Sequence, residues 1–394
     1  MKALVIGAGG MGRAAAWDLA RQPGMEVVRL VDRSMDKLVS AERELGKVLV
    51  TGTHGNPPAR VETEPFDLDD TGAQVDLLRE FDVAISAADY RYNAALTRSA
   101  IEAKTHLCDL GGNLAVVHQQ LKLHEEARRR GITVVPDCGL APGLACQLAA
   151  LGVQRLDTVD TVRLRVGGLP AHPQPPLGYK LVFSVRGLTN EYLEPAEIVR
   201  NGQLAVVPSL EDVETIRFPP PFGAMEAFNT SGGASTLTRT LRSKVRHLDY
   251  KTVRYPGHCA FFAALRDLGF LSEQTFDAAM PIVPREFTER LLERSLFDET
   301  DTDVVLMRVE VTGTQRGESV RQIFEMIDVH DPKTGHSAMA RTTGYSAAAV
   351  AYMLAAGAIS QRGVLPGEHA LPLEEYLGAV RARGLDIAER TEPG

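Results

Sequence analysis

The sequence has few cysteines, no long hydrophobic run and no excess of positive charge, and each shortage excludes a class of protein. The four cysteines form no C-x-x-C pair, which excludes a disulfide framework and argues against any metal site of the structural zinc type. The longest apolar run, Ala347–Ile359, is shorter than the ~18 residues that a membrane helix needs. A formal net charge of −8 argues against a general nucleic-acid surface.

The start of the sequence lacks the features of a secretory signal. Its apolar stretch, Ala3–Ile6, is short and is followed at once by glycines. Together with the cysteine pattern, this predicts a cytoplasmic protein that binds neither membranes nor nucleic acid.

The 394 residues are enough for two domains, and the pattern of the sequence changes near residue 143. Before that point, short apolar runs alternate with amphipathic stretches, beginning with Ala3–Ile6, Met11–Arg21 and Val27–Val31. We therefore predict an α/β fold with a doubly wound parallel sheet, a Rossmann domain, over residues 1–142, completed by residues 341–394. Residues 143–340, with their hairpin pattern and proline-rich loops, predict an inserted α+β domain.

A glycine-rich loop follows the first predicted strand and opens the first predicted helix. Its form is G-x-G-x-x-G, with Gly7, Gly9 and Gly12 at the defining positions and Gly10 and Met11 between them. Such a loop places the helix N-terminus, with its free N–H groups, against a pyrophosphate. The sequence therefore predicts a dinucleotide site.

The residues after the second predicted strand bear on which dinucleotide binds. Asp32 lies 20 residues after Gly12, where a carboxylate accepts hydrogen bonds from ribose hydroxyls and repels a 2′-phosphate. Arg33 either stacks on adenine or pairs with a 2′-phosphate. We predict NAD in preference to NADP. Asp67 is either a cofactor contact or a helix cap, while Ala87 and Ala88 are small enough for the cofactor to lie across the strand ends.

Two further clusters follow later strands of the same predicted sheet. Asp109 begins the run DLGG, and Asp137 lies in PDCGLAPG. Ligands of open parallel sheets bind at the carboxyl ends of the strands, which is where both aspartates are expected. The alternative is that each caps the helix that follows.

A third cluster lies in the predicted second domain. It contains Thr230 and Ser231 in the run NTSGG, followed by Arg239, Arg254 and His258. Hydroxyls and an arginine bind carboxylates, and a histidine transfers protons near neutral pH. The alternative is ordinary structure, since most arginines are solvated and most single histidines are structural.

Several of these strings together resemble a known family. GAGGMG, DLGGN, PDCGLAPG, VGGLP, PPLGY, EAFNTSGG and KTVRYPGH are similar to the saccharopine dehydrogenase-like family, and in particular to its lysine 6-dehydrogenases. The resemblance covers nearly the whole chain, and it implies that the inserted domain serves substrate binding and oligomerisation in a homo-oligomer, a dimer or tetramer. The family pattern has a glutamate where Gly178 stands here, whereas the following Tyr179 is retained and is predicted to bind substrate.

The resemblance implies NAD-dependent oxidative deamination of the side-chain amine of L-lysine. The product semialdehyde cyclises to a piperideine carboxylate and ammonia is released. The amine must first lose a proton, for which Asp109, Asp137 and His258 are the candidate bases. Arg239, Arg254 and the turn at Thr230 and Ser231 are candidate contacts for the substrate.

Two alternatives remain open at this point. One is a saccharopine-type or carboxynorspermidine-type dehydrogenase that uses NAD(P) on another amino acid or amine adduct, which the change at Gly178 leaves possible. The other belongs to a different class, a non-catalytic NAD-binding sensor on an enzyme fold.

Overall fold

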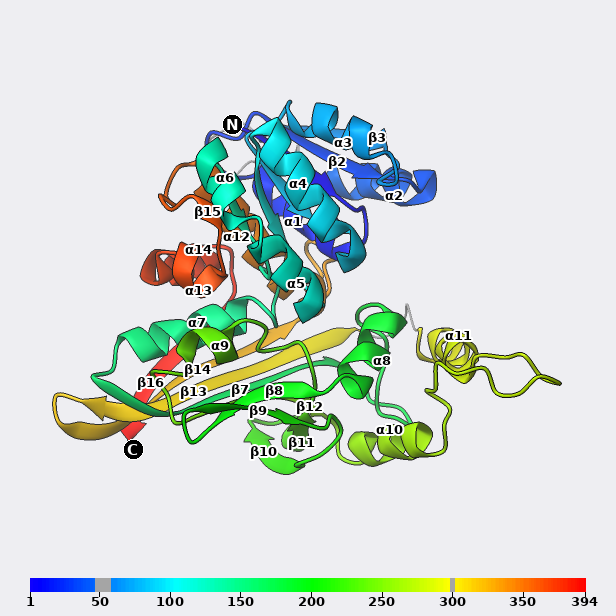
Figure 1. The fold of residues 1–394 in the computed structure, drawn as a ribbon, viewed down its shortest axis with the longest axis vertical. Helices are drawn as coiled ribbons and strands as arrows, with labels where there is room; N and C mark the ends of the chain where they lie inside the picture. Colours follow the sequence, from blue (N-terminus) through cyan, green and yellow to red (C-terminus); the bar gives the residue numbers. More distant parts are fainter. Residues whose placement is uncertain (47–57, 298–301) are drawn as a thin grey trace. The chain divides into compact units, whose positions relative to one another are not determined.

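The computed structural model describes residues 1–46, 58–297 and 302–394 of the chain. These residues form two compact units, each built from two separate stretches (Figure 1). The first unit contains Met1–Leu151 and Ala340–Leu385, and the second contains Gly152–Met339 and Asp386–Gly394. The glycine- and proline-containing run TGTHGNPP predicts a surface loop at 51–58, which, apart from Pro58, lies outside the described residues.

The first unit is built on a parallel sheet. Its strand order among the described residues is β15-β6-β5-β4-β1-β2-β3, and every neighbouring pair is parallel. The strands are β1 (Lys2–Ile6), β2 (Val27–Asp32), β3 (Arg60–Pro65), β4 (Val83–Ser86), β5 (His106–Asp109), β6 (Thr133–Val135) and β15 (Gly363–Val364). In β1, residues Ala3–Ile6 are all buried, as expected of a strand with both faces covered. The predicted parallel Rossmann sheet is confirmed.

Helices alternate with the strands of this unit, as the α/β pattern of the sequence predicts. They are α1 (Gly10–Ala20), α2 (Met35–Leu45), α3 (Thr71–Leu78), η2 (Tyr90–Tyr92), α4 (Asn93–Ala103), α5 (Leu114–Leu121), α6 (His124–Arg130), α13 (Gly367–Ala370) and α14 (Leu373–Ala382). Two further helices, α7 (Leu144–Gln154) and α12 (Ala338–Ala355), each have residues in both units. No helix in the described ranges is long and apolar enough to cross a bilayer.

The second unit is built on a mixed sheet. Its order among the described residues is β10-β11-β12-β7-β13-β14-β16, with β8 beside β12 and β9 beside β8. Its strands are β7 (Thr158–Pro170), β8 (Ala196–Arg200), β9 (Gln203–Val207), β10 (Glu214–Phe218), β11 (Gly223–Asn229), β12 (His247–Arg254), β13 (Asp303–Gln315), β14 (Glu318–Val329) and β16 (Ala388–Pro393). Its helices are α8 (Val185–Leu193), α9 (Leu237–Leu241), α10 (His258–Asp267) and α11 (Pro284–Leu296).

Two details of the second unit differ from the sequence-based expectation. Residues 386–394 were expected in the first unit, but β16 pairs antiparallel with β14 and belongs to the second. The glycines at 313 and 317 predict a hairpin turn over residues 313–317, but the β13–β14 hairpin turns at Arg316 and Gly317, and Gly313 lies inside β13. A Cβ on Gly313 would lie 1.9 Å from the carbonyl oxygen of Thr158, where the register between β13 and β7 shifts, so this glycine serves a bulge.

Candidate functional site

The glycine-rich loop of the first unit contains two glycines that the backbone conformation or packing of the protein requires, and two that neither requires. A Cβ on Gly12 would lie 1.8 Å from the Gly7 carbonyl oxygen, and Gly7 has a φ of +107°. A Cβ on Gly9 or Gly10 would meet nothing within 4 Å. Because protein packing does not explain these last two glycines, the open space over them fits a pyrophosphate that approaches the backbone.

The N-terminus of α1 is suited to bind that pyrophosphate. Its N-cap is Gly9, with no side-chain hydrogen bond to the first turn, and that turn contains no acidic residue. The backbone N–H groups at Met11 and its neighbours therefore have no side-chain acceptor, and the helix dipole favours an anion there. Ala87 and Ala88 lie against the same loop, since a Cβ on Gly7 would lie 2.7 Å from the Ala87 oxygen and 3.0 Å from the Ala88 nitrogen.

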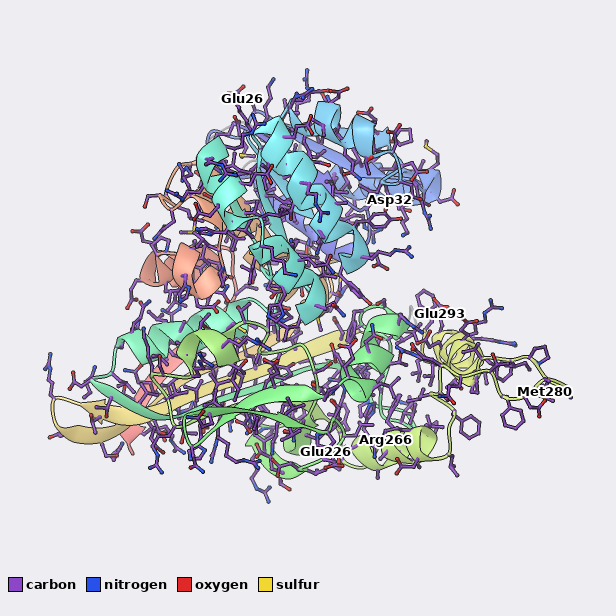
Figure 2. The ribbon with its side chains drawn as sticks, in the orientation of Figure 1. Glu26, Asp32, Glu226, Arg266, Met280 and Glu293 are labelled. Carbon is purple, nitrogen blue, oxygen red and sulfur yellow. The ribbon has the colours of Figure 1, made fainter. Side chains whose placement is uncertain are left out.

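Asp32 ends β2 and shapes the loop through its carboxylate (Figure 2). One oxygen accepts the Ala8 N–H at 2.8 Å, and the other accepts the Ser34 N–H at 2.9 Å. The next residue, Arg33, is exposed and makes no hydrogen bond or ion pair within the described part of the chain. Asp32 thus has a structural task that does not depend on a ribose, while Arg33 is available to a phosphate.

Asp67 does not cap α3, which is one of the two tasks predicted for it from the sequence. It is exposed, and its carboxylate accepts the Asp69 N–H at 3.0 Å in a turn after β3. The cap of α3 is Asp70, whose carboxylate accepts the Ala73 N–H. Asp67 is therefore a turn residue.

Asp109, at the end of β5, is fully buried and holds two loops together. Its carboxylate accepts hydrogen bonds from Gly111 N at 2.9 Å, Asp137 N at 3.2 Å and the Gln120 side chain at 2.7 Å. Burial raises the pKa of Asp109, and these hydrogen bonds act in the opposite direction. Because both oxygens are already used as acceptors, Asp109 is better placed to position the loops than to accept a substrate proton.

Asp137 lies beside Asp109 in a strained backbone conformation. Its φ of +61° is uncommon for a residue other than glycine, and such strain is concentrated at functional sites. A Cβ on Gly111 would lie 2.1 Å from Asp137 Oδ1, so only glycine allows this carboxylate its place. The structure therefore brings the two predicted aspartates together at the strand ends.

The second unit brings together three of its residues around a buried arginine. Arg254, at the end of β12, is 2% exposed, and its Nε donates to the Tyr192 hydroxyl at 3.1 Å. Its guanidinium lies 4.8 Å from the ring centre of Tyr179. The Tyr192 hydroxyl is 2.9 Å from Nε2 of His258. We call Tyr179, Tyr192, Arg254 and His258 the arginine cluster.

His258 is a hydrogen-bond acceptor in this cluster and not a proton-transfer group. Its Nδ1 lies 3.2 Å from the Leu177 carbonyl, which only accepts, so Nδ1 carries the hydrogen and Nε2 accepts from Tyr192. Burial, together with Arg254, lowers the pKa of His258 to about 3. A histidine that stays neutral throughout the physiological range does not match the general base that the sequence suggested.

Thr230 and Ser231 lie on segments that contact those of the arginine cluster. Arg239, which was predicted to bind substrate with them, lies elsewhere in the unit. The Thr230 hydroxyl is 2.7 Å from that of Thr252 on β12, and the Ser231 hydroxyl donates to the Asn190 carbonyl at 3.4 Å. Arg239 is half exposed and forms an ion pair with Glu197 on β8, with an Nη2–Oε1 distance of 2.5 Å. That pairing makes Arg239 a surface residue of a different part of the unit.

Glu191 is a candidate that the sequence reasoning missed. It precedes Tyr192 on α8, and its carbonyl accepts the Ser231 N–H at 3.0 Å. Burial raises the pKa of the Glu191 carboxyl to about 7, although Arg254 acts to lower it. Nothing in the run LTNEYL marks this glutamate, because its importance depends on β12 bringing Arg254 beside α8.

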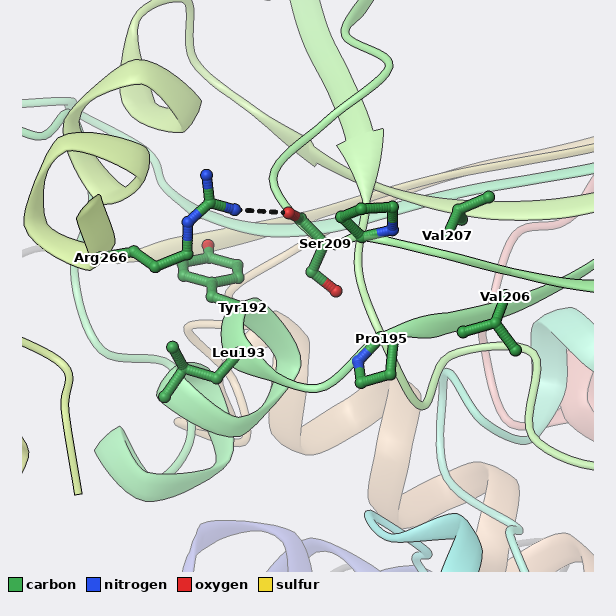
Figure 3. A pocket seen from close by; sticks show the side chains of 8 residues that line it. Tyr192, Leu193, Pro195, Val206, Val207, Ser209 and Arg266 are labelled. Atoms are coloured by element: carbon green, nitrogen blue, oxygen red, sulfur yellow. Dashed lines mark hydrogen bonds between the residues drawn. The ribbon is translucent and has the colours of Figure 1, made fainter. Parts of the chain in front are cut away.

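The second unit also contains a hollow of about 380 Å³ beside Tyr192 (Figure 3). Its lining is mainly apolar, from Tyr192, Leu193, Pro195 and residues 206–209, and its one charged group is Arg266. Arg266 already donates to the Ser209 carbonyl at 2.9 Å and to Asp267 at 2.8 Å. Since its arginine is already paired, this hollow offers no evident site for a charged ligand.

Two models of one protein family match this chain, one over its N-terminal part and one over the rest. The family model "Saccharopine dehydrogenase NADP binding domain" matches residues 3–135, and "Saccharopine dehydrogenase C-terminal domain" matches residues 137–385. The fold is similar to that of apo saccharopine dehydrogenase (L-Glu forming) from Saccharomyces cerevisiae, with a TM-score of 0.79, 20% identity and 99% of each chain covered.

Two curated relatives give a more detailed comparison. Saccharopine dehydrogenase [NADP(+), L-glutamate-forming] of Pyricularia oryzae is 27% identical over 66% of this chain and 58% of that protein. The enzyme with the same name from Schizosaccharomyces pombe is 26% identical over 60% of this chain and 54% of that protein. The matches thus span somewhat more than half the length of these relatives.

The prediction of NAD as the cofactor is wrong. The matching family model describes an NADP binding domain, and both relatives carry NADP(+) in their names. The position of Asp32 predicts a contact with the ribose hydroxyls, but its carboxylate accepts hydrogen bonds from the Ala8 and Ser34 amides. The next residue, Arg33, is exposed and able to pair with a 2′-phosphate.

Proposed function

Because this chain belongs to the saccharopine dehydrogenase family, we propose that it is an NADP-dependent oxidoreductase acting on a C–N bond of a lysine-derived amino acid. The observation that carries the proposal is Arg254, which is buried and forms no ion pair with any described carboxylate. An unpaired buried charge is costly to keep. A guanidinium held in this way is suited to bind the carboxylate of an amino acid.

The finer proposal is that the substrate is L-lysine and that its side-chain amine is removed. When bound, NADP+ accepts the hydride from the amine-bearing carbon. Water and NADP+ are consumed, and the semialdehyde, ammonium, NADPH and a proton are formed. Arg254 holds the carboxylate, and Tyr179 packs under the guanidinium to fix its plane.

A neutral amine is required before the hydride leaves, so a residue must take a proton from the ammonium. Of the three predicted bases, Asp109 already accepts three N–H donors and His258 accepts the Tyr192 hydroxyl. Asp137, which Asp109 and Gly111 position at the strand ends, is the base that we propose.

A second candidate substrate is a saccharopine-type adduct, in which the side-chain nitrogen carries another amino acid. The names of the relatives from P. oryzae and S. pombe favour it. The backbone conformation at Gly178 explains why this chain has no glutamate at that position, in contrast to the lysine 6-dehydrogenase pattern. Its φ of +55° disfavours a glutamate there, so this loop does not supply an acid for an ammonium.

The test is NADPH formation by the purified chain with L-lysine and, separately, with saccharopine, from neutral to alkaline pH. We expect NADPH with one of the two, a strong loss in Arg254→Met, partial retention in Arg254→Lys and little change in the matched control Arg239→Met. Thermal unfolding of each variant separates loss of activity from loss of fold. If neither substrate yields NADPH, the proposed function is wrong, and tight NADPH binding without turnover would instead favour the sensor.

A further inference from the structure

Glu191 and Arg254 carry opposite charges in the same part of the second unit and are not joined to each other. Glu191 directly precedes Tyr192 on α8, and the Tyr192 hydroxyl accepts a hydrogen bond from Arg254 Nε at 3.1 Å, so the two charged residues lie on segments that are in contact. Arg254 also acts on the pKa of Glu191. No hydrogen bond or ion pair links the Glu191 carboxylate to any residue that the structure describes. Two opposite charges this near would be expected to pair unless a ligand belongs between them.

Arg254 retains donors on the side that its own contacts leave open. Its Nε donates to Tyr192 and its Nη1 donates to the Val253 carbonyl at 3.0 Å, whereas Nη2 has no acceptor among the described residues. The ring of Tyr179, a residue 5% exposed, lies under the same guanidinium and holds its plane. A buried guanidinium with an open donor is suited to a ligand oxygen.

The charges of the pair restrict the ligand. A simple anion on Arg254 would leave Glu191 facing a like charge, and a simple cation on Glu191 would face Arg254. A group with both charges on adjacent atoms satisfies the two residues at once. Resting on the proposed function, we infer that Arg254 and Glu191 form a clamp for the zwitterionic head of an α-amino acid, with its carboxylate on Arg254 and its α-ammonium on Glu191.

The surroundings of Glu191 agree with this assignment. Its carbonyl is held by the Ser231 N–H, which fixes this turn of α8 against the NTSGG loop. Arg254 is the charged group that acts on the pKa of its carboxyl, and the Glu191 charge in turn raises the pKa of Tyr179 and Tyr192. Burial raises the pKa of Glu191 to about 7, and an ammonium bound to it would lower that pKa again. Preference for the α-ammonium should therefore grow as the pH rises through 7.

The clamp is tested by calorimetric binding to the full chain without NADP. L-Lysine carries the whole zwitterion, 6-aminohexanoate lacks the α-amine, and cadaverine also lacks the carboxylate; L-norleucine and hexanoate form a second pair without a side-chain amine. The wild-type protein should bind each α-amino acid roughly tenfold or more tightly than its partner without the α-amine. Glu191→Gln should bring both ratios close to one and leave the affinity for 6-aminohexanoate intact.

Arg254→Lys should weaken every carboxylate ligand, and the control Glu194→Gln, at the exposed end of the same helix, should retain the wild-type ratio. A wild-type protein with no preference for α-amino acids overturns the clamp, as does a Glu191→Gln variant that keeps the ratio or loses both ligands equally. Binding with the expected ratio but no NADPH formation would contradict the proposed function and leave the clamp standing.

Discussion

The hydroxyl of Tyr192 donates a hydrogen bond of 2.9 Å to Nε2 of His258, inside a part of the second unit that is closed to water. With Tyr192 as the donor, this hydrogen bond requires a neutral imidazole, because a protonated Nε2 has no lone pair to accept the hydroxyl hydrogen. The Leu177 carbonyl fixes the same tautomer from the other side of the ring. His258 is thus part of the support of Arg254.

The state of His258 predicts a loss of stability in acid. Its pKa is lowered to about 3 in the folded chain, whereas an unfolded histidine takes up its proton near 6.5. The contribution to stability is therefore complete above pH 6.5 and is lost as the pH falls toward 3. Urea unfolding across this range should show a shallower loss for His258→Leu than for the wild type. An equally shallow curve for the exposed control His369→Leu would contradict this account.

The glycine-rich loop predicts opposite effects for two alanine substitutions. Gly12→Ala should destabilise the first unit by several kcal/mol, because its Cβ would overlap the Gly7 carbonyl. Gly9→Ala should leave the melting temperature nearly unchanged and weaken NADPH binding about tenfold or more, because only the cofactor is crowded. Thermal unfolding and a fluorescence titration with NADPH measure the two effects, and a Gly9→Ala protein that binds normally would refute the assignment of this space.

Arg33 predicts the cofactor preference. Arg33→Ala should weaken NADPH binding by roughly tenfold or more, the size of a charge-assisted phosphate contact, and affect NADH little. Lys37→Ala, an exposed change one turn into α2, is the matched control. Equal losses for NADPH and NADH in Arg33→Ala would show that this arginine contacts adenine and not the 2′-phosphate.

Arg239 predicts a nearly silent substitution. Its ion pair with Glu197 is half exposed, and such pairs contribute between zero and about 1 kcal/mol. Arg239→Met should therefore change stability by less than about 1 kcal/mol and leave amino-acid binding unaltered. A clear loss of binding, measured by calorimetry, would return Arg239 to the substrate contacts.

The predicted homo-oligomer has a testable surface in the second unit. Large apolar side chains are exposed along the segment that contains α10 and α11, and Met280 lies at the tip of the loop that precedes α11 (Figure 2). The exposed members include Phe270, Phe276, Met280, Phe287 and Phe297. Exposed patches of this kind favour association. Combined Phe276→Ser and Met280→Ser should lower the mass in light scattering, whereas Val206→Ser, exposed elsewhere, should not.

The local sequence pattern was sufficient to predict the strands of the first unit. It was insufficient to predict which charged and polar side chains meet in the second unit. The strands around Gly7 and Asp32 follow from buried apolar runs and the position of glycines, which act over a few residues. The surroundings of His258 depend on Tyr192 and Leu177, which β-sheet pairing and helix packing bring from distant parts of the chain. The fold therefore changes the roles expected of these residues from the sequence. Burial makes His258 a poor base, and the ion pair with Glu197 makes Arg239 a surface residue.

The division of each unit into two stretches bears on how the protein is made. The parallel sheet of the first unit gains β15 only from residues after 340, and β14 of the second remains an open edge until β16 pairs with it. A growing chain on the ribosome therefore carries both units unfinished until synthesis has passed residue 386. Unpaired strand edges invite association with other chains, so the newly made protein should depend on chaperones, or on slow late translation, more than a protein of continuous domains.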